Sequence, residues 1–158
     1  MKLTEIVVQP AVTPALKSTE RNGVLGEMVD SLVASGELSA DIRDEIVAKL
    51  LDREEKGSTG FGRGVAVPHA KHPAVKRLIA AVGLSERGVD FASLDKQPVF
   101  SIFLLLSPKD QPEEHLQAME VIFKNLSKEN FRRFLRQAGS VEEVIALLDE
   151  ADSQQLPG

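Results

Sequence analysis

The sequence predicts an α/β protein in which helices cover both faces of a central mixed β-sheet. Helical apolar patterns come before and after the segments that have the composition of strands, an order typical of layered α/β folds. The strand candidate at 99–106, VFSIFLLL, is almost entirely apolar, which is typical of a strand covered on both faces. We therefore expect this strand at the centre of the sheet.

The N-terminal part predicts an irregular lead-in followed by two helices. Residues 1–17 contain two prolines and no sustained periodicity, so we expect only a short extended piece at 6–8. Apolar residues then recur at helical spacing from Leu25 to Val33. We expect Ser18 or Thr19 to cap this helix and Gly36 to end it.

The second helix and the strands follow. Ser39 precedes the second helical stripe, which ends at Lys56 and Gly57, a cation and a glycine stop. Strands are expected at 65–67, 78–84 and 99–106. Because proline has no N–H for a strand ladder, we expect the first strand to end at Pro68 and to leave His69 at the rim of the sheet.

Three helices are expected after residue 111. Pro112 occupies the first helical position, and Ser140 with Glu143 forms a capping box for the last helix. A chain of 158 residues is long enough for one domain, and we expect it to span residues 1–151, with a flexible tail at 152–158. The side chains expected to face the core are Leu116, Met119, Phe123 and Leu126, then Phe131, Phe134, Leu135 and Ala138, then Val144, Leu147 and Leu148.

The composition excludes several classes of function. The net charge is −5 and no long basic run occurs, which disfavours capture of nucleic acid by charge. The absence of cysteine excludes disulfides, thiolate nucleophiles and Cys-ligated zinc. No apolar stretch approaches the roughly 20 residues that span a bilayer, so no membrane insertion is expected. The start, MKLTEIVVQPAV, lacks the pattern of a secretory signal, and we expect a cytoplasmic protein.

The segment GSTGFGRGVAVPHAKHP, residues 57–73, holds the densest group of candidate functional residues. Gly57 and Gly62 have the spacing of a P-loop, but Arg63 and Gly64 stand where lysine and Ser/Thr are needed. A dinucleotide-binding fingerprint fails because residue 65 is valine. Two interpretations stay open on the residues alone: an anion-binding loop that leads to a reactive imidazole, or a glycine-rich turn with an ordinary surface histidine.

His115 adds a second imidazole to this question. It falls in the first turn of the helix that begins near Pro112, where free N–H groups and the helix dipole favour an anion. Together with His69 it makes a candidate site for a phosphoryl group. A metal site formed by His69, His72 and His115 is the alternative, and it is disfavoured because no carboxylate lies at helical spacing to His69. We expect His72 to be an ordinary exposed residue.

The run REEKGSTGFGRGVAVPHAK, residues 53–71, resembles the active-site segment of the fructose/mannitol-type EIIA domains of the phosphoenolpyruvate-dependent phosphotransferase system, which include nitrogen-regulatory members. The runs GVDFASLDKQPV, LLLSPKDQPEEHLQAM and FRRFLRQAGSVEEVIALL extend the resemblance over most of the chain. The resemblance implies the single-domain EIIA type-2 fold. It also implies that His69 accepts a phosphoryl group on Nε2 from the carrier protein HPr, with His115 beside it and Arg53 supplying positive charge.

The same resemblance leaves two roles open. One is a stand-alone nitrogen-regulatory protein whose phosphorylation state is signalled to target proteins. The alternative is a sugar-specific EIIA that passes the phosphoryl group to an EIIB domain during uptake. No cofactor or metal is expected in either case, and the role of Arg63 is open.

Further residues near this segment carry expectations of their own. We expect Phe61 to be exposed and to help dock a partner, and the basic helical face of Arg132, Arg133 and Arg136 to be simply solvated. The candidates for cradling the phosphoryl group are Ser58, Thr59, Gly60, Gly62 and Gly64.

Overall fold

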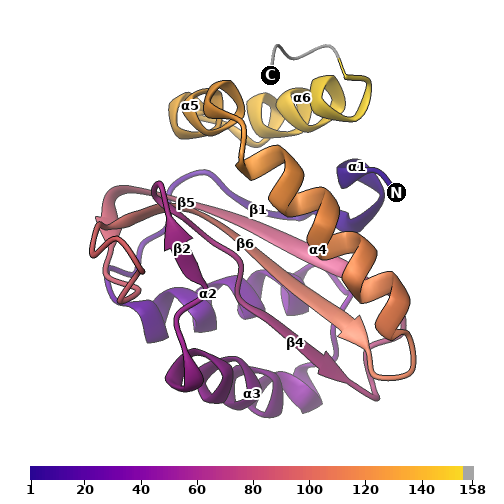
Figure 1. The fold of residues 1–158 in the computed structure, drawn as a ribbon. Coiled ribbons are helices and arrows are strands. Elements are labelled where there is room, and N and C mark those ends of the chain that lie inside the picture. The colour runs from indigo at the N-terminus through magenta and orange to yellow at the C-terminus, as the bar shows by residue number, and fades with distance from the viewer. Residues whose placement is uncertain (155–158) are drawn as a thin grey trace.

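The computed structural model describes residues 1–154, and its central feature is a six-stranded mixed sheet (Figure 1). The strand order is β1-β5-β6-β3-β2, and β4 follows β3 along the same side of β6. Strand β6 is antiparallel to β5 and parallel to β3 and β4, while β1 is parallel to β5. The mixed sheet and the central place of residues 99–106 are confirmed. The strands are β1 Val7–Thr13, β2 Gly60–Gly62, β3 Val65–Ala66, β4 His69–His72, β5 Ile79–Val89 and β6 Val99–Pro108.

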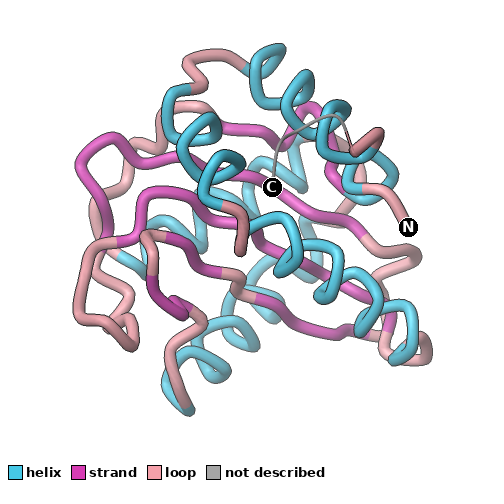
Figure 2. Tube along the Cα trace, turned by 45° about the horizontal axis from the view of Figure 1, so that its top comes forward, coloured by secondary structure: helices cyan, strands magenta, loops and turns pink. Residues whose placement is uncertain are grey.

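Helices cover both faces of this sheet (Figure 2). Phe103 and Leu105 pack toward α1, α4, α5 and α6, whereas Ile102 and Leu104 pack toward α2 and α3, because successive side chains of a strand point to opposite faces. Within residues 1–154, no helix is long and apolar enough to cross a membrane. The helices are α1 Leu3–Ile6, α2 Arg21–Ala34, α3 Arg43–Lys56, α4 Pro112–Leu126, α5 Glu129–Gln137 and α6 Val141–Asp152, with a 3-10 turn at Ala40–Ile42 before α3.

The N-terminal segment is more regular than expected. Residues 7–13 form β1, an edge strand, so the prediction of an irregular lead-in is wrong there. Pro10 lies inside β1, and its pairing with β5 shifts register between Val7 and Val12. An edge strand tolerates proline because one side of the strand needs no ladder hydrogen bonds.

The start of α2 also differs from the prediction. Its N-cap residue is Glu20, which makes no capping hydrogen bond with its side chain, so neither Ser18 nor Thr19 caps the helix. Instead, the backbone N–H of Ser18 donates to the Glu27 carboxylate at 2.9 Å. The predicted end is confirmed, since Gly36 follows α2 with a φ of 85°.

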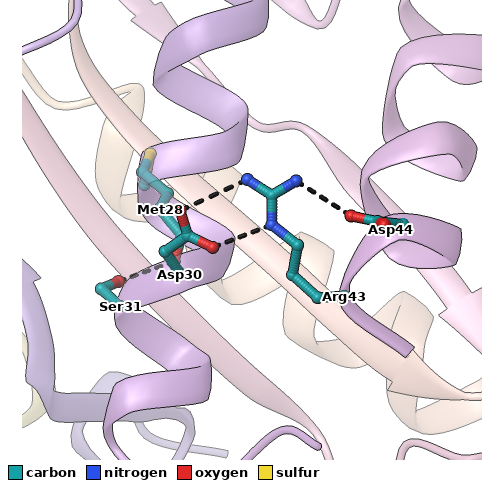
Figure 3. A network of polar contacts seen from close by, with 5 residues as sticks. All are labelled: Met28, Asp30, Ser31, Arg43 and Asp44. Atoms are coloured by element: carbon teal, nitrogen blue, oxygen red, sulfur yellow. Dashed lines mark hydrogen bonds and ion pairs between the residues drawn. The ribbon is translucent and has the colours of Figure 1, made fainter. Parts of the chain in front are cut away.

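Arg43 joins α2 to α3, the helix that carries Arg53 (Figure 3). Its guanidinium donates to Asp30 of α2 at 2.8 Å and to Asp44 at 3.2 Å. A Cβ at Gly26 would lie 3.0 Å from this guanidinium, so the glycine gives Arg43 room to reach across α2. Both carboxylates are solvent-exposed, so the network contributes little to stability and acts mainly on the relative placement of the two helices.

The boundaries of the C-terminal helices match the prediction closely. Pro112 is the first residue of α4, and the Ser140 hydroxyl accepts a hydrogen bond from the Glu143 N–H at the start of α6. Asp152, the first residue of the expected tail, is instead the last residue of α6. Residues 155–158 of that tail lie outside the described residues.

The face of α4 that meets the sheet is only partly the predicted one. Leu126 is buried and Met119 packs against the core, as predicted, whereas Leu116 is 60% exposed and Phe123 is 37% exposed. Phe134 of α5 is also exposed, contrary to the prediction. The residues of α4 that are buried are His115, Ala118, Ile122, Asn125 and Leu126.

Candidate active site

A short hairpin carries the chain into the segment that contains His69. Strands β2 and β3 pair across a turn in which Arg63 and Gly64 have φ values of 62° and 78°, as in the two-residue turns that match strand twist. After β3 the chain does not leave the sheet at Pro68, because the Pro68 carbonyl accepts from the Leu105 N–H at 2.9 Å. The predicted rim position is therefore wrong: His69 begins β4, which continues parallel to β6.

The imidazole of His69 has one nitrogen bound and one free. Its Nδ1 lies 2.8 Å from the Val67 carbonyl oxygen. Because a carbonyl only accepts, Nδ1 carries the proton and Nε2 keeps its lone pair. Burial lowers the pKa of His69 below its usual 6.5 despite the hydrogen bond to Val67, and the positive charge of Arg53 adds to this effect. His69 is therefore a neutral imidazole at neutral pH with Nε2 as its nucleophilic atom.

His115 lies beside His69 and is more deeply buried. The centroids of the two rings are 5.5 Å apart, and His115 is only 8% exposed. Its Nδ1 is 2.6 Å from the hydroxyl of buried Ser107 in β6, which leaves Nε2 as the nitrogen available to the pocket. Burial lowers the pKa of His115 to about 4, and the charges of His69 and Lys71 act in the same direction.

Both imidazoles line one pocket of about 430 Å³ between α3, β4 and α4. Arg53 lines it as well, so the structure brings together the three site residues that the sequence predicted. Four side chains of the pocket are cationic and one is acidic, which makes it locally positive in a protein of net charge −5. Its other lining residues are Lys49, Asp52, Lys56, Ala70 and Lys71.

The lysines of the pocket were not recognised as site residues from the sequence. Lys49, Arg53 and Lys56 are spaced so that they share one face of α3, and this spacing was the signal available in the sequence. Arg53 is fixed by a hydrogen bond from Nη1 to the Gly57 carbonyl at 2.7 Å. Its other guanidinium N–H groups make no hydrogen bond within residues 1–154.

The five predicted cradle residues do not line this pocket. The hydroxyl of Ser58 donates to the Phe91 carbonyl, and the N–H and hydroxyl of Thr59 both donate to the carboxylate of buried Glu54. The glycines serve backbone geometry: Gly60, Gly62 and Gly64 all lie in or beside the β2–β3 hairpin. Sequence reasoning missed Glu54, which ties the loop to α3.

His72 is buried, contrary to the prediction that it is exposed. Its Nδ1 accepts a hydrogen bond from the Ala74 N–H at 3.0 Å, so Nε2 carries the proton and donates to Glu45 of α3 at 2.8 Å. His72 thus points toward α3 and away from the other two imidazoles. Across residues 1–154, no group of three His, Cys, Asp or Glu side chains has an arrangement that could hold a metal ion.

Phe61 is half-buried, not exposed. The centroid of its ring lies 4.7 Å from the centroid of the Phe123 ring on α4. The β2–β3 hairpin is therefore packed against the half-exposed side of α4.

The fold and this pocket define an α/β domain with two neutral imidazoles in a cationic pocket. Residues 7–151 match the family described as "Phosphoenolpyruvate-dependent sugar phosphotransferase system, EIIA 2", and the chain belongs to this family. It is 32% identical to a nitrogen regulatory protein of Bradyrhizobium diazoefficiens, over 94% of this chain and 95% of that protein. It is 34% identical to the fructose-specific EIIABC component of Bacillus subtilis, over 96% of this chain but only 24% of that longer protein.

Solved structures agree with this assignment. The nitrogen regulatory protein IIA-Ntr of Neisseria meningitidis superimposes with a TM-score of 0.82 at 31% identity, covering 91% of this chain and 97% of that one. The expected EIIA type-2 fold is therefore confirmed.

Proposed function

We propose that this protein carries a phosphoryl group on Nε2 of His69, which accepts it from the phosphohistidine of an HPr-type carrier. The observation that carries the proposal is the hydrogen bond between Nδ1 and the Val67 carbonyl, because it leaves Nε2 unprotonated inside a cationic pocket. In the transfer, the Nε2 lone pair forms a bond to phosphorus while the bond from phosphorus to the donor imidazole breaks. The donor nitrogen keeps that electron pair, and the donor ring leaves as a neutral imidazole because its other nitrogen carries a proton. The step therefore balances without a metal or cofactor.

The remaining groups of the pocket stabilise the transferred group. Arg53 and the lysines place positive charge where the three phosphoryl oxygens gather, and preorganised charge of this kind lowers the barrier of phosphoryl transfer. His115 supports the same step when Ser107 donates to its Nδ1. Nε2–H of His115 then donates to a phosphoryl oxygen on its neighbour.

The proposed role is regulatory: target proteins in the cytoplasm respond to whether His69 is phosphorylated. This is supported by a match that spans almost the whole length of a relative named nitrogen regulatory protein. The alternative is transfer to an EIIB domain in sugar uptake, supported by the match to a fructose-specific EIIABC component.

Labelling with phosphoenolpyruvate, enzyme I and HPr tests the proposal. The intact protein gains the mass of one phosphoryl group, His69→Ala gains none, and His72→Ala is the control that still becomes labelled. His115→Ala becomes labelled at a rate lower by about 100-fold, the typical loss when one transition-state donor is removed. The assignment is wrong if His69→Ala becomes labelled at the wild-type rate.

A second assay separates the two roles. The phosphorylated protein is mixed with an EIIB domain, and, in parallel, candidate target proteins are captured with the phosphorylated and unphosphorylated forms. Rapid transfer to EIIB favours sugar uptake. Capture that depends on the phosphorylation state, without such transfer, favours regulation.

A further inference from the structure

A second cationic pocket lies at the far end of α4 from the histidines. Arg63 on the β2–β3 turn and three arginines of α5 line a pocket of about 440 Å³ together with Glu129 and Gln137. Twelve residues of helix separate His115 from Ser127, which contacts Arg63. At 1.5 Å per residue they span about 18 Å, so the two pockets are separate. The arginines of α5 are Arg132, Arg133 and Arg136.

Protein groups hold these four guanidiniums in place without neutralising them. Arg132 donates to the Leu126 carbonyl at 2.9 Å, and Arg63 approaches the Ser127 carbonyl at 3.5 Å. The guanidinium of Arg136 lies over the ring of Phe100, 3.6 Å from its centroid, and Arg133 lies over Phe134 at 5.1 Å. Within residues 1–154, no ion pair joins any of the four to a carboxylate.

The charge of this pocket points to an anionic ligand. Four cations and one carboxylate leave three positive charges in one hollow of a protein whose net charge is −5. The bonds to carbonyls and rings use few of the five N–H donors that each guanidinium has. The unused donors have the planar fork geometry that matches the paired oxygens of phosphate groups.

We propose that this pocket binds a compact polyanion with two or more linked phosphate groups, such as a polyphosphate or the phosphate chain of a nucleotide. The volume falls in the range of small-molecule sites, and several phosphates are needed to balance three positive charges. The site does not depend on phosphoryl transfer at His69, and its ligand is bound rather than consumed.

Titration calorimetry with inorganic tripolyphosphate tests the proposal. The wild-type protein binds one tripolyphosphate, and added salt weakens the binding. Arg133→Gln and Arg136→Gln each raise the Kd by about tenfold, the loss of one charge-assisted contact. Arg21→Gln removes one cation on α2, away from this pocket, and leaves the Kd within about twofold. Thermal unfolding of each variant checks that it is folded.

Four results overturn the proposal. The first is the absence of saturable binding at low salt. The second is an equal loss of affinity for tripolyphosphate in Arg21→Gln and Arg133→Gln, which indicates that binding responds to net charge alone. The third is a loss of affinity in Lys49→Gln while the affinity of Arg133→Gln is unchanged, which places the anion in the histidine pocket. Tighter binding of poly-glutamate than of tripolyphosphate contradicts the ligand class and indicates an acidic protein surface instead.

Discussion

At the scale of single residues, two oxygen atoms determine what the paired imidazoles can do. The Val67 carbonyl holds the proton on Nδ1 of His69, and the Ser107 hydroxyl engages Nδ1 of His115. Each contact leaves Nε2 as the nitrogen that faces a ligand. These contacts support the complementary roles that we propose, His69 as nucleophile and His115 as donor, although both are neutral imidazoles at neutral pH.

The lowered pKa of His115 makes stability depend on pH. Its pKa is about 4 in the folded protein and about 6.5 in an unfolded chain. Between these values the unfolded chain binds more protons, so the free energy of unfolding falls as the pH falls from about 6.5 toward 4. We therefore expect the free energy of unfolding, measured with urea, to fall more in the wild type than in His115→Asn when the pH is lowered from 7 to 5. The difference in stability between the two proteins then changes with pH. A difference that does not change with pH contradicts the lowered pKa.

At the scale of elements, β4 connects the site to the rest of the fold. His69 and Lys71 belong to the pocket, whereas His72 points the other way and donates to Glu45 of α3. This strand thus connects His69 with the helix that carries Arg53.

Removing the imidazole of His72 tests this link. His72→Ala leaves the Ala74 N–H and the space beneath β4 without their partner, so we expect the free energy of unfolding to fall by about 1–3 kcal/mol. Urea unfolding measures it, with exposed Lys76→Ala as the matched control. Labelling at His69 persists in the variant. A fall of less than about 0.5 kcal/mol in the free energy of unfolding would show that this contact does not stabilise the fold.

The elements also show what the sequence could predict and where it failed. The starts of α4 and α6 could be predicted because local chemistry sets them. Pro112 has the fixed φ of a first helical residue and lacks an N–H that would go unpaired there, and the Ser140 hydroxyl caps the first turn of α6. The buried face of α4 was only partly predicted because that helix has two apolar stripes, and only the packed sheet determines that Ala118 and Ile122, not Leu116, face the core.

At the site, too, the sequence did not show how the elements pack together. The two histidines were predicted from their places near the ends of elements, and the family resemblance added Arg53 to them. The structure brings the three residues together. The lysines were missed because their convergence depends on how α3 packs beside β4. The direction of His72 likewise depends on the continuation of the strand past Pro68, which local sequence rules did not predict.

At the scale of the whole molecule, the first and last helices are joined. The Asp152 carboxylate at the end of α6 accepts hydrogen bonds from the N–H groups of Leu3 and Thr4 and from the Thr4 hydroxyl, at 2.6 to 3.0 Å. Helices α1 and α6 therefore pack as one layer with α4 over the sheet. A domain that ended at residue 151, as predicted from the sequence, would lack Asp152 and therefore this contact.

Asp152→Ala tests the contribution of this contact. Hydrogen bonds to a charged group contribute about 1.5–3 kcal/mol, so we expect a loss of about that size in the free energy of unfolding. Asp149→Ala is the matched control, since its exposed side chain lies on the same helix and makes no such bond within residues 1–154. Equal stability of the two variants contradicts the role assigned to Asp152.

The proposal that Nε2 of His69 accepts the phosphoryl group is tested most directly by NMR of the histidine side-chain nitrogens before and after phosphorylation. Long-range proton–nitrogen correlations identify the protonated nitrogen of each ring and the nitrogen that bears phosphorus. We expect His69 to be protonated on Nδ1 in the free protein and phosphorylated on Nε2 afterwards. Phosphorus on Nδ1 of His69, or on His115 or His72, would contradict it.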